Sequence, residues 1–92
     1  MAKSDKVIWK TVLSAVDEQC IRLPEGAMVL TAQVQRGDIC LWFLCNPDRQ
    51  SIPRRIFIVG TGNLMPYDVP ARYIGTVQLE AGALVFHVFE EV

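Results

Sequence analysis

The sequence predicts a small all-β protein, an antiparallel two-sheet sandwich or flattened barrel of about seven short strands with little helix. Apolar residues recur at alternate positions in short runs, as at Val7, Trp9 and Leu13. Because successive strand side chains point to opposite faces of a sheet, this period predicts half-buried strands. Gly, Pro, Asp and Asn separate the runs about every 8–12 residues. No run has the length and period of an amphipathic helix.

The first two strands are predicted near the amino end. One covers residues 6–13, where apolar and polar positions alternate. Residues 14–19 are polar, and Ser14 is a suitable cap for a single helical turn there. A short second strand covers residues 20–23 and ends at the turn of residues 24–26, where Pro fixes φ and Gly permits a positive φ.

The clearest element is a β-hairpin in the middle of the chain. Its first arm covers residues 27–35, its turn is Arg36-Gly37-Asp38, and its second arm covers residues 39–45. The second arm contains only apolar residues, which is typical of a strand covered on both faces. We therefore expect residues 41–44 to be buried at the centre of the fold.

The remainder of the chain continues the pattern. Residues 46–53 form a polar loop bounded by prolines, and a strand follows over residues 54–59. Residues 60–70 contain two Gly and two Pro, which indicates a long loop. A second hairpin is predicted after it, with arms at residues 71–79 and 83–89.

Length and composition predict one domain spanning residues 1–92. The hydrophobic fraction of 51% provides a substantial core, and the net charge of -1 favours neither nucleic acid nor an anionic membrane. No apolar signal-peptide core is present, and the longest uncharged stretch, residues 39–47, is about half of what a spanning helix needs. We therefore expect a cytoplasmic protein that binds no membrane and does not contact nucleic acid directly. Its oligomeric state is not predictable from the sequence.

Few residues in this chain are of the types that carry catalysis. His87 is the only histidine, and its place on a predicted strand favours a structural role. Cys40 and Cys45 lie five positions apart on one apolar strand, and so on opposite faces. Burial of a thiol raises its pKa, which opposes nucleophilic reactivity. We therefore expect no catalytic residue, no metal site and no cofactor, and the protein is not expected to be an enzyme.

Three arginines form the first candidate binding segment. Arg49, Arg54 and Arg55 lie within seven residues of one another and include half of the six arginines of the chain. Arg can hold a carboxylate or phosphate through two parallel hydrogen bonds. The alternative is a solvated loop that keeps a sheet edge soluble.

An apolar loop forms the second candidate binding segment. Leu64, Met65 and Tyr67 lie in the long loop, close to the prolines that limit its flexibility. Met and Tyr are enriched at protein interfaces, and a stiff loop loses little entropy when it docks. The alternative is that the loop folds back over the sheet edge.

Several segments spread over nearly the whole chain carry a family resemblance. They are Ile8-Trp9-Lys10, Asp17-Glu18-Gln19, Leu23-Pro24-Glu25-Gly26-Ala27, Gln33-Val34-Gln35, Gly60-Thr61-Gly62, Tyr73-Ile74-Gly75-Thr76 and Leu84-Val85-Phe86-His87-Val88-Phe89. Together they resemble a family of small uncharacterised proteins of tailed bacteriophages and prophages, in which the Gly-Thr-Gly is often followed by His rather than by Asn63. The resemblance implies a phage origin and an accessory role, and it carries no catalytic signature.

The prediction for function is a non-enzymatic phage accessory protein that binds and inhibits a host protein or ribonucleoprotein complex in the bacterial cytoplasm. Phage accessory proteins of this size commonly block host systems, including CRISPR effector complexes and other defences, so the prediction rests on analogy. Two alternatives stay open. One is a protein that sequesters a nucleotide-like ligand with Arg49, Arg54 and Arg55, and the other is a virion or assembly component.

Overall fold

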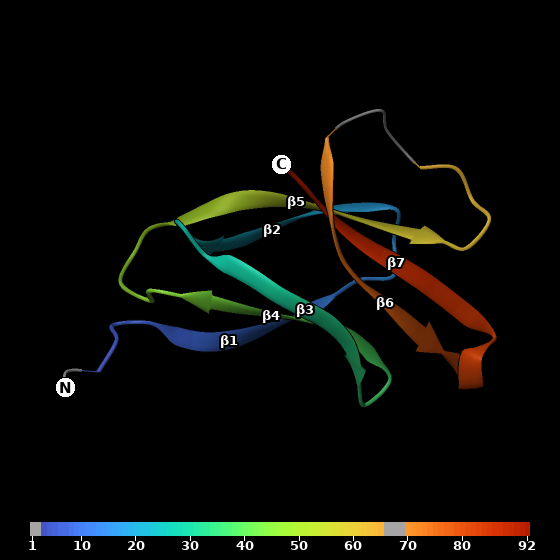
Figure 1. Ribbon diagram of the computed structural model, residues 1–92, viewed down its shortest axis with the longest axis horizontal. Coiled ribbons are helices and arrows are strands. Elements are labelled where there is room, and N and C mark those ends of the chain that lie inside the picture. Colours follow the sequence, from blue (N-terminus) through green and yellow to red (C-terminus); the bar gives the residue numbers. More distant parts are fainter. Residues whose placement is uncertain (1–2, 66–69) are drawn as a thin grey trace.

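The computed structural model describes residues 3–65 and 70–92, within which seven strands form two antiparallel sheets that do not close into a barrel (Figure 1). In chain order the strands are β1 (Val7–Leu13), β2 (Glu18–Pro24), β3 (Met28–Gln35), β4 (Asp38–Cys45), β5 (Ser51–Gly60), β6 (Ala71–Leu79) and β7 (Leu84–Glu91). The predicted all-β class is confirmed. One short 3₁₀ turn, η1 (Glu80–Gly82), joins β6 to β7. Nothing helical in the described ranges has the length and apolar character that crossing a bilayer requires.

The predicted central hairpin is formed by β3 and β4, which are joined by a two-residue turn. Arg36 and Gly37 both have positive φ, at 53° and 82°, as required by the type I′ turn that matches the twist of the flanking strands. The first sheet has the order β1-β4-β3. The predicted central position of residues 39–45 is therefore confirmed.

The two faces of β4 differ in how well they are covered. Leu41 and Phe43 are buried on the face that belongs to the core, at 0% and 4% exposure. Trp42 and Leu44 lie on the opposite face and are only half-buried. The expectation that both faces are covered is therefore wrong at Trp42 and Leu44, although Cys40 on the same face is buried, at 1% exposure.

The second sheet has the order β2-β5-β7-β6. Its strand β5 begins at Ser51, three residues earlier than the sequence predicts. Pro53 is tolerated because it pairs with Arg22 of β2, while pairing of β5 with β7 begins only at Ile56. The main core lies between the sheets and consists of Leu13, Ala32, Ile39, Leu41, Ile56, Ile58, Val77 and Val88.

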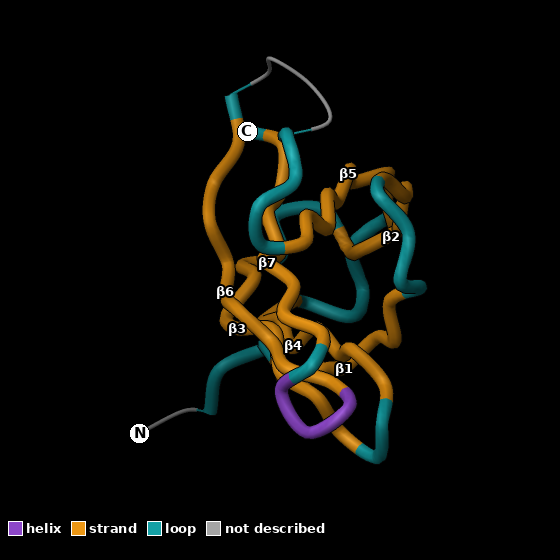
Figure 2. The backbone as a smooth tube through the Cα atoms, turned by 90° about the vertical axis from the view of Figure 1, so that its right-hand side faces the viewer, coloured by secondary structure: helices purple, strands orange, loops and turns teal. Residues whose placement is uncertain are grey.

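The two sheets meet along β3 and β6, which lie side by side (Figures 1 and 2). Each strand has an irregular register, between Val29 and Thr31 in β3 and between Tyr73 and Gly75 in β6, and such bulges bend a strand. A Cβ on Gly75 would lie 3.3 Å from the carbonyl oxygen of Ala32. Gly75 therefore permits an approach of two backbones that a side chain would hinder.

The connection between β1 and β2 differs from its prediction. Residues 14–17 form a bend with no helical turn, and Glu18 and Gln19 belong to β2. The side-chain amide of Gln19 replaces the expected cap: its Oε1 accepts from the backbone nitrogen of Ser14 at 3.0 Å, and its Nε2 donates to the Ser14 carbonyl oxygen at 2.7 Å. These two bonds satisfy backbone groups that a helical turn would otherwise use.

Candidate functional site

Arg54, a predicted binding residue, lies on the same face of β5 as the core residue Ile56. Its Nε donates to Oε2 of Glu90 at 2.6 Å, and its Nη1 donates to the carbonyl oxygen of Ala27 at 3.1 Å. Glu90 is only 1% exposed and also accepts from Arg72 at 3.4 Å. Since Glu90 belongs to β7 and Ala27 immediately precedes β3, these charges connect the second sheet to the first.

Arg55 and Arg49 also have acidic partners within the chain. Arg55 lies 2.6 Å from Oε1 of Glu18 through its Nε and 3.3 Å from Oε2 of Glu91 through its Nη1. Arg49 lies 3.5 Å from Oε1 of Glu25, and both of these side chains are more than half exposed. The positive charge that predicted a binding patch is therefore compensated within the protein. At Arg49 the compensation is weak, because solvent screens the exposed pair.

Arg49 and the predicted apolar loop lie at opposite ends of β5, whereas Arg54 and Arg55 lie within this strand. Arg49 lies in the loop that precedes the strand, whereas Leu64 and Met65 follow it (Figure 1). A strand of this length separates its ends by roughly 30 Å, so Arg49 and Leu64 do not form one surface. Leu64 is 93% exposed and Met65 is 44% exposed. Tyr67 lies outside the described residues.

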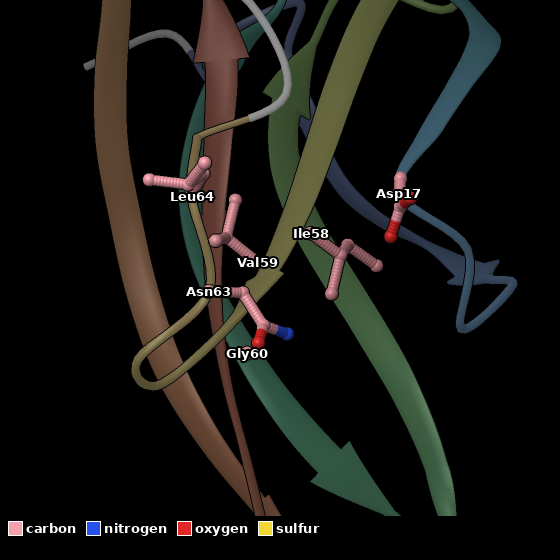
Figure 3. Close-up of a pocket in the computed structure, with 6 residues that line it drawn as sticks. All are labelled: Asp17, Ile58, Val59, Gly60, Asn63 and Leu64. Carbon is pink, nitrogen blue, oxygen red and sulfur yellow. The ribbon is translucent and has the colours of Figure 1, made fainter.

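Two small hollows flank the loop that follows β5. The first, of about 200 Å³, is lined by Asp17, Ile58, Val59, Gly60, Asn63 and Leu64 (Figure 3). The second, of about 260 Å³, is lined by Gly60, Thr61, Asn63, Ala83, Leu84, Val85 and Phe86. Sites for drug-sized ligands measure roughly 300–1,000 Å³. Neither hollow therefore favours a ligand of nucleotide size.

His87 takes part in a chain of hydrogen bonds that the sequence analysis did not find. Its Nε2 lies 2.7 Å from Oγ1 of Thr61, and its Nδ1 lies 2.9 Å from Oγ1 of Thr76, which in turn lies 2.6 Å from the hydroxyl of Tyr73. The register of the β6–β7 hairpin, which pairs Thr76 with His87, is the signal that would have found part of this group. Hydroxyls accept and donate, so they hold the ring in either tautomer, as a structural histidine requires.

The cysteines differ in their surroundings. Cys40 and Cys45 are buried, and their pairing with Gln33 and Val7 places them on opposite faces of β4. Burial raises the pKa of the Cys45 thiol, which lowers its reactivity. Cys20 is exposed. No group of three or more His, Cys, Asp or Glu in the described ranges is placed to hold a metal ion.

The outer face of the first sheet, turned away from the second sheet, is an accessible apolar feature that the sequence analysis missed. Ile8, Leu44 and Met28 pair across β1, β4 and β3, so their side chains share this face. Ile8 and Met28 are each 60% exposed, and Val12 on the same face is 53% exposed. The half-buried Trp42 lies among them. Exposed apolar side chains that gather on one face are a feature of interaction sites.

Comparison with known proteins supplies a family and no activity. Residues 4–92 match the model of a family described as a domain of unknown function (DUF7352). No curated protein and no solved structure matches the chain. The phage origin implied by the sequence resemblance stays a prediction.

Proposed function

Because the chain belongs to the DUF7352 family, whose description assigns no function, we propose a function from the surface of this protein. We propose that it is a non-enzymatic protein that binds another protein through the outer face of its first sheet. The observation that carries this proposal is the exposure of Ile8, Val12 and Met28, at 60%, 53% and 60%, on one face of three paired strands.

The composition of the outer face favours a protein partner over a nucleic acid or a small ligand. Trp42 and Met28 are residue types enriched at protein interfaces, and Trp is also frequent among the residues that dominate binding energy. Nucleic-acid surfaces instead concentrate Arg and Lys, and Lys10 is the one charged side chain that β1 contributes to this face. Neither hollow beside β5 is lined by Arg49, Arg54 or Arg55, the residues on which the nucleotide alternative rests.

The outer face replaces the predicted arginine segment as the leading surface. Arg54 and Arg55 each contact a carboxylate at 2.6 Å, and a new anionic ligand would have to displace it. Leu64 and Met65 remain accessible, so the loop after β5 provides a comparison surface with apolar residues of its own.

We further propose that the partner is a host protein or ribonucleoprotein complex and that binding inhibits it, a CRISPR or other defence complex being the first class to examine. This narrower proposal is supported by the family resemblance alone. A virion or assembly role is its competitor, and it predicts that the protein co-purifies with particles.

Affinity capture with matched variants tests the protein-binding proposal. Wild-type protein, the double variant Ile8→Thr/Met28→Thr and the control Leu64→Thr are immobilised and exposed to the same bacterial lysate, after thermal unfolding has shown that all three fold. We expect proteins that are retained by the wild type and by Leu64→Thr and lost from the double variant. Equal retention by the double variant would move binding away from the outer face.

Calorimetric titration with ATP tests the nucleotide alternative separately. Saturable binding that Arg49→Ala abolishes would favour ligand sequestration over protein binding. No heat beyond dilution is the result that the protein-binding proposal expects.

A further inference from the structure

β1 is the least protected edge of the two sheets. Among the strands of residues 3–65 and 70–92 it pairs with β4 alone, so one side of its backbone has no described strand beside it. Its register is continuous, and it contains no Pro and a single charged residue, Lys10. The other edges differ: β3 and β6 lie against each other, and β2 contains Pro24 and charged residues. Edge strands that lack protective devices are templates for pairing with another strand.

The side chains of β1 are accessible on both faces. Ile8 and Val12 point to the outer face and are 60% and 53% exposed. Val7 and Trp9 point to the other face and are 39% and 46% exposed. An added strand would therefore find cross-strand partners on each of its own faces.

Positive charge without an acidic partner gathers at the same place. The three lysines of the chain are Lys3, Lys6 and Lys10, and the ion pairs found in the described ranges involve arginines only. Lys10 donates from its Nζ to the neutral side chain of Gln35. Asp5, the acidic residue adjacent to β1 in the chain, accepts from Asn46.

We propose that β1 accepts an extended segment of the partner protein as a fourth strand of the first sheet, and that this segment places a carboxylate opposite Lys10 between apolar side chains opposite Ile8 and Val12. The inference rests on the proposed function, because it specifies how the partner engages that surface. In strand addition, backbone hydrogen bonds supply affinity, and side chains at alternate positions supply specificity.

Charge decides between a partner segment and a second copy of this chain. Two copies of β1 paired about Lys10 would place two ammonium groups directly opposite each other, which is destabilising. A segment that carries Glu or Asp at this position gains a favourable cross-strand pair instead. The structure therefore favours a partner with an acidic, alternately apolar strand.

A charge-swap titration tests the chemistry of the added strand. The probe is acetyl-Thr-Val-Thr-Glu-Thr-Val-Thr-amide, compared with the same peptide that has Lys in place of Glu, and amide shifts of the ¹⁵N-labelled protein report binding. We expect shifts along β1, with the Glu peptide binding about two- to fivefold more tightly, the range of one cross-strand pair. Lys10→Glu should reverse this preference, and Gln78→Glu, at an exposed site on β6, should retain it.

N-methylation of the Glu peptide tests the backbone part of the proposal. In an added strand, alternate amides point toward β1, so methylating one alternate set should abolish binding and methylating the other set should leave it intact. Equal binding of both methylated peptides would overturn strand addition while leaving face docking, and thus the proposed function, in place.

Three further outcomes would also overturn the inference. They are absence of binding by the Glu peptide, a peptide preference unchanged in Lys10→Glu, and a micromolar self-association in sedimentation that the neutral variant Lys10→Gln strengthens, which would identify a second copy as the occupant. Equal retention of proteins by Ile8→Thr/Met28→Thr in the capture experiment would contradict the proposed function instead, because that experiment concerns the outer face and not the edge of β1.

Discussion

At the scale of single residues, the buried pair of Arg54 and Glu90 carries the strongest structural consequence. The Glu90 carboxylate is 1% exposed and receives Arg54 at 2.6 Å. Removing one member of such a pair leaves an uncompensated buried charge, which costs more than the pair itself contributes. We therefore expect Arg54 to stabilise the fold whether or not it also meets a partner.

Substitution of Glu90 measures this effect. We expect Glu90→Ala to lower the free energy of unfolding by about 3–5 kcal/mol in urea titrations. The control Glu25→Ala removes the exposed partner of Arg49 and should cost less than about 1 kcal/mol. Equal costs for the two variants would contradict the assignment of Glu90 to a buried charge pair.

The Cys45 thiol predicts a pH dependence of stability. Burial raises its pKa in the folded state, so above the ordinary pKa of a thiol the unfolded chain loses a proton that the folded chain keeps. The contribution of this thiol to the free energy of unfolding is fully present below its unfolded pKa, and it decreases as the pH rises toward its folded pKa. Urea midpoints measured from pH 7 to 10 should fall more steeply for the wild type than for Cys45→Ala. Parallel curves would contradict this.

Paired charges also explain why the candidate site was hard to predict from the sequence. Arg54 and Glu90 are 36 positions apart, and only the β5–β7 pairing brings them together. The sequence around these arginines contains three arginines and one aspartate. The carboxylates that compensate the arginines lie far away in the sequence, so a local count of charges does not include them. For Leu64 the sequence predicted a loop and left open whether it folds back over the sheet edge; in the structure Leu64 is exposed.

At the scale of elements, β4 shows what alternation predicts and what it leaves open. An uninterrupted apolar run correctly predicted a central strand. The run could not show whether one face of the strand or both faces are covered, because a continuous apolar run is compatible with both arrangements. The exposed outer face follows from the arrangement of the sheets, which places the second sheet against one side only.

The two faces of β4 should respond differently to truncation. Leu41→Ala, at 0% exposure in the main core, should lower the free energy of unfolding by about 2–5 kcal/mol through lost burial and a residual cavity. Leu44→Ala, on the half-buried outer face, should cost clearly less. Chemical denaturation of both variants under one set of conditions checks the order, and a larger cost at Leu44 would show that the outer face is covered in solution.

At the scale of the whole molecule, the strand order was not predictable from the sequence. The hairpins β3–β4 and β6–β7 follow from turn residues between neighbouring runs, as at Gly37. The pairs β1–β4 and β2–β5 each join strands that have two other strands between them in the chain. One sequence contains no local signal for such partners.

Strand order predicts how truncation acts. β7 lies inside the second sheet, between β5 and β6, so a chain that ends at Gly82 should lose cooperative unfolding. Removal of residues 1–5, which precede β1 in the chain, should retain cooperative unfolding, because the described residues among them, 3–5, lie outside the strands. Thermal melts followed by circular dichroism compare the two variants. A sigmoidal melt of the chain that ends at Gly82 would contradict the role given to β7.

The interior place of β7 also sets the order of events during synthesis. β5 emerges well before the strand that must pair with its second edge, whereas β3 and β4 emerge together and can close their hairpin at once. Until Leu84–Glu91 has been translated, the nascent chain therefore exposes an apolar β5 edge and an unpaired Arg54. Such an intermediate is of the kind that chaperones bind, and we expect the nascent protein to be prone to aggregation until β7 has been made.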